Sequence, residues 1–263
     1  MKPAHRLALG TAVVAVPLLL ALVGPFLAGE AGPRGTSFTT GGGHWLGTDF
    51  TGRDVLRQVL LGGRPVVVVA LTATALTYAV ALPVGLAAAL TRRPWLEELL
   101  TRPLDVLLAV PSLLLILLAA AFLDPGPAGI TVLVALVAVP DTTRLVRAAA
   151  ADAASRPAVE ALRLQGETWA RVALGHVARA TLRTLVTDAG VRLTGALYLV
   201  GTAAFLGVGV APDAADWAVM VDRNRAGLAL QPWAVAVPAA LVVALSLGTN
   251  LLFDAALHRK KAA

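Results

Sequence analysis

The chain has 263 residues, of which 57% are hydrophobic and only 14% are charged, and its net charge is +6 at pH 7. Soluble domains carry about 25% charged residues, so this deficit predicts a protein that folds in lipid. The sequence contains no cysteine, which excludes a disulfide framework and a thiolate metal site. The positive charge does not predict nucleic-acid binding, because that function requires a basic face on a folded soluble domain.

Six stretches without charged residues follow one another along the chain. A helix that crosses the hydrocarbon core needs roughly 20 mainly apolar residues, so we predict an all-α polytopic membrane protein with six transmembrane helices. The first stretch exceeds the apolar region of a signal peptide, which is about 7–15 residues long, and we expect it to be retained. The expected helices are at about 7–28, 65–90, 104–122, 129–147, 186–209 and 233–256.

The positions of lysine and arginine predict the orientation of these helices. With the N-terminus in the cytoplasm, six spans place both termini and most basic residues on the cytoplasmic side, as the positive-inside rule requires. We therefore expect a multi-pass protein of the cytoplasmic (inner) membrane with both termini cytoplasmic. The expected parts are an N-terminal transmembrane helix at 1–28, an outer loop with a short interfacial helix at 29–64, a five-helix core at 65–256 and a cytoplasmic tail at 257–263.

The most polar segment near the front of the chain is HWLGTDFTGRDVLRQVLLGG, residues 44–63. Within it, residues 54–61 have an apolar side and a basic side, which predicts a short amphipathic helix lying in the membrane interface. Gly62 and Gly63 follow directly and predict the end of that helix.

The polar side chains of this segment allow two interpretations. His44, Asp49 and Asp54 are chemically suitable metal ligands. Their spacing is irregular, however, and Arg53 would compete for the carboxylates. We therefore expect no metal site, and instead a structural role in helix capping, ion pairing and docking at the outer interface.

A long polar loop, residues 148–183, is expected on the inner side between the fourth and fifth helices. Ser155 is a suitable N-cap and Pro157 suits a first helical turn. Gly166 is placed to stop that helix with a left-handed residue, and Thr168 is placed to cap a second helix. The pattern predicts two helices joined by a glycine elbow across the cytoplasmic end of the bundle. These helices would transmit a movement of a soluble partner to the membrane helices.

A few charged or aromatic residues lie in or near the expected spans. Asp188 and Arg192 stand four residues apart, either on a transport pathway or as an interfacial pair whose arginine reaches the membrane surface. Asp105 and Asp141, near the inner ends of two helices, are candidates for a gate or for contacts within the bundle. Trp217 is expected to contact a partner outside the membrane or to anchor at the interface.

The inner loop contains VEALRLQG, which resembles the EAA motif of ABC importer permeases. In that family this loop forms the coupling helix that inserts into the ATP-hydrolysing subunit. Leucine replaces the second alanine of the motif in this sequence. The residues that match or occupy the motif are Val159, Glu160, Ala161, Leu162 and Gly166.

The segment before the second helix, HWLGTDFTGRDVL, is similar to the signature of the dipeptide, oligopeptide and nickel branch of these permeases. The blocks RPLDVLLAVPSLLL, RLVR and AFLGVGVAP also resemble that branch and occur in the matching order, so the resemblance covers about residues 44–256. Within the branch the chain resembles the C-type permease. The outer motif residues are His44, Leu46, Gly47, Thr48, Asp49, Gly52, Arg53 and Asp54.

The resemblance implies a type I ABC importer permease fold, with residues 148–183 as the coupling loop. It implies import of peptides, nickel, a metal chelate or related small solutes by alternating access. The implied partners are a homologous second permease in a heterodimer, two ABC ATPase subunits, an extracytoplasmic solute-binding protein and membrane lipid. ATP and Mg²⁺ would bind in the ATPase subunits, and no cofactor is expected in this chain.

Two other classes of protein remain as alternatives. A membrane-embedded enzyme would need paired acidic or histidine-rich positions within the spans, and we identify no catalytic residues of that kind. The sequence also contains no glycine-rich loop that ends in Lys-Ser or Lys-Thr for binding nucleotide phosphates. A channel-like structural membrane protein would not need the long inner loop with its glycine elbow.

Overall fold

The structure, a computed structural model, describes residues 3–41 and 43–261. Its regular elements in this part of the chain are helices, together with two isolated β-bridges in the loop before α2. In chain order they are α1 (Pro3–Leu27), α2 (Val55–Leu90), α3 (Pro94–Leu108), α4 (Ser112–Leu123), α5 (Pro127–Ala154), α6 (Pro157–Leu164), the π-helix η1 (Arg171–Val177), α7 (Ala178–Phe205), α8 (Trp217–Asn224), the 3₁₀ turn η2 (Arg225–Gly227) and α9 (Trp233–Lys261).

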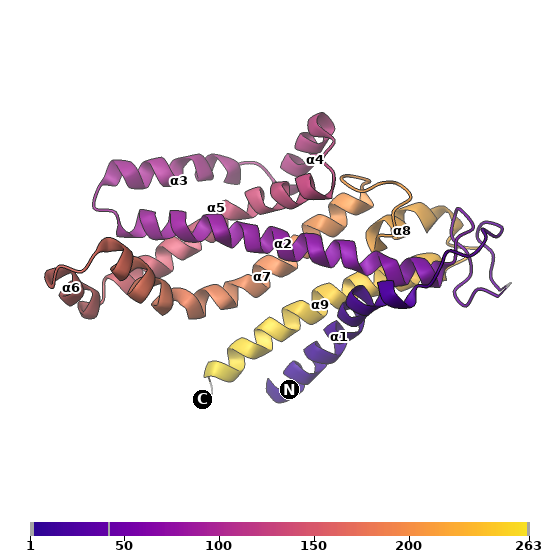
Figure 1. The fold of residues 1–263 in the computed structure, drawn as a ribbon, viewed down its shortest axis with the longest axis horizontal. Helices are drawn as coiled ribbons and strands as arrows, with labels where there is room; N and C mark the ends of the chain where they lie inside the picture. The colour runs from indigo at the N-terminus through magenta and orange to yellow at the C-terminus, as the bar shows by residue number, and fades with distance from the viewer. Residues whose placement is uncertain (1–2, 42, 262–263) are drawn as a thin grey trace.

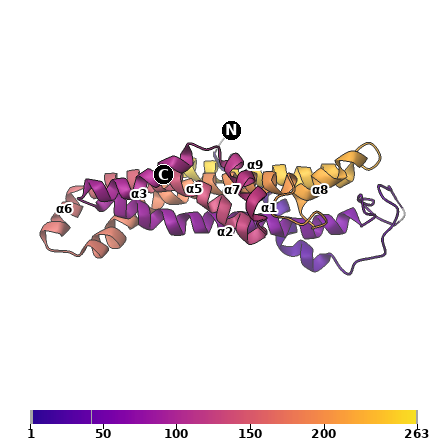
Figure 2. The ribbon, with the colours of Figure 1, turned by 90° about the horizontal axis from the view of Figure 1, so that it is seen from above.

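The helices form an elongated and shallow bundle (Figures 1 and 2). Helix α2 extends along nearly the full length of the bundle and packs mainly along α5, while α1 packs along α9. The short helix α6 lies at one end, and the loop between α1 and α2 lies at the other (Figure 1). The start of α1 and the end of α9 lie near each other, away from that loop (Figure 1).

Within the described part of the chain, four helical segments are long and apolar enough to cross a membrane, namely Ala8–Leu27, Val55–Leu90, Pro127–Ala154 and Trp233–Phe253. The pair α3 and α4 supplies a fifth if it counts as one span, although it is bent by 86°. The expected single helix at 104–122 is therefore wrong. The helix is broken before Pro111, because proline lacks an N–H group and disfavours helix at the residue before it.

The predicted fifth span, at 186–209, corresponds to α7, which has 28 residues but carries Arg183, Asp188 and Arg192 up to its midpoint. These charges set α7 apart from the four strongly apolar segments. The count of six transmembrane helices therefore stays a prediction.

Helix α2 starts at Val55 and continues without a break to Leu90. The expected separate interfacial helix at 54–61 is wrong, because Gly62 and Gly63 lie inside α2. Both glycines are buried, and a Cβ atom on either would collide with the side chain of Trp217. They permit close packing of that indole instead of ending the helix, and the packing compensates for their weak helix propensity.

The inner loop is also shorter than expected. Helix α5 extends to Ala154 instead of ending near residue 147, because residues 148–154 are rich in alanine, the best helix former. The chain resumes helical structure at residue 169, and η1 leads directly into α7. The expected loop of 148–183 is thus reduced to α6 and its short connections, and the expected tail at 257–263 is helical as far as Lys261.

Candidate functional site

Helix α6 is an amphipathic helix with one anchored face and one free face. Val159 is 5% exposed and joins a buried cluster with Val146 of α5 and Val172 and Val177 of η1. Leu164, by contrast, is 84% exposed. Helical spacing puts Val159 and Leu164 on different faces of α6. The structure places the EAA-like segment at the surface of one end of the bundle (Figure 1).

The exposed face of α6 presents the centre of that segment. Glu160 and Ala161 are exposed, whereas Leu162 is half-buried and packs beside Val159. An exposed carboxylate on a helix that is held by its apolar neighbours is available to a soluble partner. This arrangement leaves α6 attached to α5 and η1, so a force on its free face would reach both.

Gly166 ends α6 with a φ of +79°, the left-handed conformation that the sequence predicts there. The backbone N–H of Glu167 donates to the carbonyl oxygen of Leu162 at 3.1 Å, as in a Schellman cap. The Thr168 hydroxyl oxygen then accepts from the N–H of Arg171 at 3.4 Å, so Thr168 caps the next helical segment. The glycine elbow is therefore confirmed.

Two details at the edges of α6 differ from expectation. Ser155 does not cap α6, because its hydroxyl donates to the carbonyl oxygen of Asp152 at 2.8 Å at the end of α5. The seven residues of η1 form a π-helix that sequence reasoning missed. Local π-helical turns have no simple sequence pattern and depend on packing, here of Val172, Ala173 and Val177.

A polar network connects α2, α5 and α7. Arg192 lies 3.1 Å from Asp188 through Nε and 3.5 Å from Asp141 through Nη1. The Tyr78 hydroxyl donates to Asp188 Oδ2 at 2.6 Å. The predicted i,i+4 pair is present, and partners from two further helices join it. Sequence reasoning missed Tyr78, although a tyrosine in an apolar helix signals that its hydroxyl needs a partner.

Asp105 does not join this network. It forms an ion pair with Arg144 of α5 at 2.6 Å. A second ion pair, between Glu97 and Arg147, also connects α3 to α5. Since α3 has no buried residue, these contacts fasten an otherwise exposed helix to the bundle.

The outer motif residues mainly hold the loop before α2 in shape. Asp49 is 5% exposed, and its Oδ1 atom accepts from the N–H groups of Thr51 and Arg53, both at 2.8 Å. His44 Nδ1 lies 2.8 Å from Asp54 Oδ2, and Asp54 Oδ1 caps α2 by accepting from the N–H of Arg57 at 3.1 Å. Among the described residues no group of three or more His, Cys, Asp or Glu side chains is arranged to hold a metal ion.

Other residues of the motif connect separate loops. The carbonyl oxygen of Leu46 accepts from the Gln231 side chain, and Arg53 Nη1 donates to the carbonyl oxygen of Asp213 at 2.7 Å. Thr48 is 1% exposed and donates to the carbonyl oxygen of Thr36 at 2.6 Å. These contacts join segments that are up to 185 residues apart in sequence.

The two glycines of the motif have positive φ values, +69° at Gly47 and +76° at Gly52. Any other residue would be strained at these positions. A Cβ atom would also meet the Gln231 side chain at Gly47 and the carbonyl oxygen of Gly35 at Gly52. The glycines therefore allow the loops to approach one another closely.

Trp217 does not lie at the surface, and both expectations for it are wrong. Its side chain is fully buried, and its indole Nε1 donates to the carbonyl oxygen of Val59 at 2.8 Å. The expected outer loop at 210–227 contains α8, whose N-cap Asp216 accepts from the N–H groups of Ala218 and Val219. Burial raises the pKa of the Asp216 carboxyl to about 6, although those two hydrogen bonds act in the opposite direction.

The structure is a helical bundle with an exposed amphipathic helix, α6, between the long helices α5 and α7. The fold is similar to a chain in an inward-facing structure of the MetNI methionine ABC transporter, with a TM-score of 0.59. The match covers 74% of this chain and 94% of that chain at 16% sequence identity. The fold is therefore that of a type I ABC importer permease.

Residues 81–261 match the family described as "binding-protein-dependent transport system inner membrane component", and the chain belongs to this family. It is 30% identical to a peptide permease protein of Brucella abortus over 80% of this chain and 70% of that protein. It is 27% identical to the dipeptide transport system permease protein DppC of Alkalihalophilus pseudofirmus over 93% of this chain and 82% of that protein. The predicted family is confirmed.

The chain is thus a transmembrane permease subunit of an ABC importer and a multi-pass protein of the inner membrane. Permeases of this kind work together with ATPase subunits and binding proteins.

Proposed function

We propose that this permease imports peptides and that α6 is its coupling helix. The names of its relatives, a peptide permease and a dipeptide permease, support peptides as the solute. Nickel and metal chelates, which the sequence resemblance also allows, have no comparable support from these two relatives.

The observation that carries the coupling role is the two-sided burial of α6. Its exposed Glu160 and Ala161 would enter a cleft on the ATPase subunit, while Val159 and Leu162 hold the helix on the bundle. Closure of the ATPase subunits would then move α5 and α7 together and turn the cavity from inward to outward facing. Such alternating access is largely rigid-body motion.

The proposed assembly contains this chain and a homologous second permease as a heterodimer, with two ABC ATPase subunits and an extracytoplasmic solute-binding protein. ATP and Mg²⁺ would bind in the ATPase subunits, so this chain would bind no cofactor and perform no catalysis. Both termini would be cytoplasmic, in keeping with the distribution of basic residues. Helix α6 and the loop before α2 lie at opposite ends of the bundle (Figure 1), so in this orientation α6 would face the ATPases and the loop would face the binding protein.

We also propose a role for the charged residues near the inner half of the bundle. The network of Asp141, Asp188 and Arg192 would keep α5 and α7 moving as one body during gating. Asp105 would keep α3 attached to that body through Arg144.

The test is solute uptake by the complete complex in proteoliposomes, with a mixture of dipeptides or, separately, Ni²⁺ as solute. We expect Glu160→Ala and Gly166→Pro each to abolish most ATP-driven uptake while membrane insertion stays normal. Glu98→Ala is the matched control, because Glu98 is also exposed and its one ion pair with the described residues is to Arg102 on α3. If both α6 variants transport as well as the control, the coupling role is refuted, and if nickel but no dipeptide accumulates, the proposed solute is wrong.

A further inference from the structure

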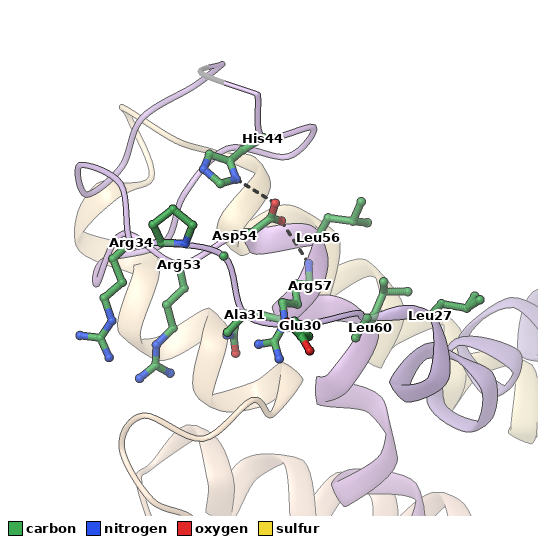
Figure 3. Close-up of a pocket in the computed structure, with 14 residues that line it drawn as sticks. Leu27, Glu30, Ala31, Arg34, His44, Arg53, Asp54, Leu56, Arg57 and Leu60 are labelled. Atoms are coloured by element: carbon green, nitrogen blue, oxygen red, sulfur yellow. Dashed lines mark hydrogen bonds and ion pairs between the residues drawn. The ribbon is translucent and has the colours of Figure 1, made fainter.

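A cavity of about 590 Å³ lies between the end of α1, the first turns of α2 and the loop that joins them (Figure 3). Three arginines line it, and we call it the arginine cavity: Arg34 comes from the loop, Arg53 precedes the N-cap of α2, and Arg57 lies in its first turn. Figure 3 shows the side chains of Arg34 and Arg53 extended side by side in the same direction. The volume is in the range of pockets that hold small ligands, about 300–1,000 Å³.

The positive charge of the cavity is only partly neutralised. Asp54 is already bonded to His44, and Glu30 is the other acidic residue among those that line the cavity. Within the described part of the chain, neither Arg34 nor Arg57 forms an ion pair with a carboxylate. An anion is therefore the ligand chemistry that this cavity favours.

Arg53 and Gln58 also favour a polar ligand. Arg53 contacts Asp213 at 3.3 Å, but the Asp213 side chain is 69% exposed, so water weakens that pair. Gln58 is 5% exposed, lines the cavity, and its side-chain amide makes no hydrogen bond with the described residues. Within the described residues its amide atoms are not among the fully buried atoms that lack a partner, so the amide is open to water or a ligand.

The other side of the cavity is apolar and lies at a membrane boundary. Leu27, Leu56 and Leu60 line it, and Figure 3 shows these side chains on the side opposite Arg34 and Arg53. The first two apolar spans end at Leu27 and begin at Val55, so the cavity lies where both meet water. Next to it on α1, Phe26 is 82% exposed.

We propose that the arginine cavity binds the phosphate headgroup of an anionic phospholipid. Guanidinium groups match phosphate oxygens in charge and geometry, and the apolar side continues toward exposed α1, where an acyl chain would lie. The combination of basic and apolar walls at a membrane boundary favours a lipid over free phosphate, which has no apolar part. This site is independent of the coupling role of α6 and would exist on either orientation of the chain.

The experiment is native mass spectrometry of the purified full-length chain with phosphatidylglycerol or phosphatidylcholine added to the detergent. We expect the wild type to retain phosphatidylglycerol preferentially. Arg34→Gln with Arg57→Gln should weaken that binding about 25-fold, because each basic residue near an anionic membrane surface contributes about fivefold. Arg223→Gln is the control and should keep wild-type binding. Arg223 is an exposed arginine on α8, and its one ion-pair contact within the described residues, to Asp222, is 3.9 Å long.

Three results would overturn the proposal. The first is equal retention of both lipids by the wild type, and the second is undiminished phosphatidylglycerol binding by the double variant. The third is displacement of the lipid by millimolar inorganic phosphate, which would make free phosphate the ligand. A thermal unfolding scan of the double variant shows that it is folded, and the measurement involves neither uptake nor ATPase, so its failure is separate from failure of the coupling proposal.

Discussion

At one end of the bundle the outer motif is held from several directions, because Thr48 and Trp217 are at most 1% exposed and hydrogen-bond to other segments. Asp49 is 5% exposed and accepts from N–H groups of its own loop. At the other end α6 makes few contacts with the bundle and exposes Glu160 and Leu164. In the outer motif the side chains of Thr48, Asp49 and Asp54 are paired within the chain. The inner end leaves polar and apolar groups free for another subunit.

This difference separates residues that maintain the fold from residues that serve a partner. Side chains that are buried and paired should change stability when they are replaced. Side chains on the free face of α6 should leave stability unchanged and affect only the work done with the ATPase subunit. The two sequence motifs that indicate the family therefore have different physical roles.

The largest expected effect on stability is that of Trp217→Ala. Loss of a fully buried indole and of its hydrogen bond to Val59 should destabilise the protein by about 3–5 kcal/mol. Thermal unfolding in detergent measures the change. Trp95→Ala, at a side chain that is 59% exposed, should stay within about 0.5 kcal/mol of wild type. Equal effects of the two would show that Trp217 is not a central contact.

Asp216 gives a pH dependence. Its pKa of about 6 is above the ordinary 3.8, so the folded state favours the neutral acid. The stability that this raised pKa gives to the folded state is fully present below pH 3.8. It is lost as the pH rises through 6, and the loss is at most about 3 kcal/mol. Asp216→Asn keeps the N-cap acceptor without the charge, so its Tm should fall less than that of wild type between pH 4 and 7. Identical Tm profiles would contradict the burial of this carboxyl.

Tyr78→Phe should have a somewhat smaller effect. The substitution removes the hydroxyl that donates to Asp188 at 2.6 Å, a charge-assisted hydrogen bond with a contribution of about 1.5–3 kcal/mol. Tyr198→Phe is the matched control, because Tyr198 is 63% exposed. Chemical unfolding of the two variants in detergent compares them, and a control that loses as much stability would remove the argument for the network.

The smallest expected effect on stability is that of Leu164→Ser on α6. Because Leu164 is 84% exposed, the Tm should stay within the error of the scan. Recovery of the ATPase subunit with affinity-tagged permease should fall severalfold, since an apolar contact is lost. Leu230→Ser, at a side chain that is 68% exposed near the opposite end, should retain the subunit as wild type does. Loss of the subunit from both variants would indicate general damage to the assembly.

Much of the fold follows from the sequence, because charge-free stretches of membrane length translate directly into helices. The elbow at Gly166 was also predictable, since a glycine after an amphipathic stretch favours a left-handed stop. Helix ends were not predictable where tertiary contacts decide them. Gly62 and Gly63 are normally helix breakers, and only the position of Trp217, 154 residues further along the chain, explains why α2 continues.

The candidate sites show the same division. The Asp188–Arg192 pair follows from i,i+4 spacing, but the contribution of Tyr78 depends on how α2 packs against α7. Likewise, the sequence indicates that Asp49 and Asp54 have structural roles, while their partners are set by loop conformation. Spacing along one helix is visible in a sequence, whereas packing between helices is not.

The most direct test of the central claim uses single-cysteine cross-linking in the assembled complex, because the chain has no cysteine of its own. One variant is Glu160→Cys on α6, and the other is Trp45→Cys, at a side chain that is 91% exposed in the outer motif. With a short bifunctional reagent, we predict that position 160 cross-links to the ATPase subunit and that position 45 does not. The assignment of α6 as the coupling helix would be contradicted if position 45 cross-links to the ATPase subunit, or if position 160 does not.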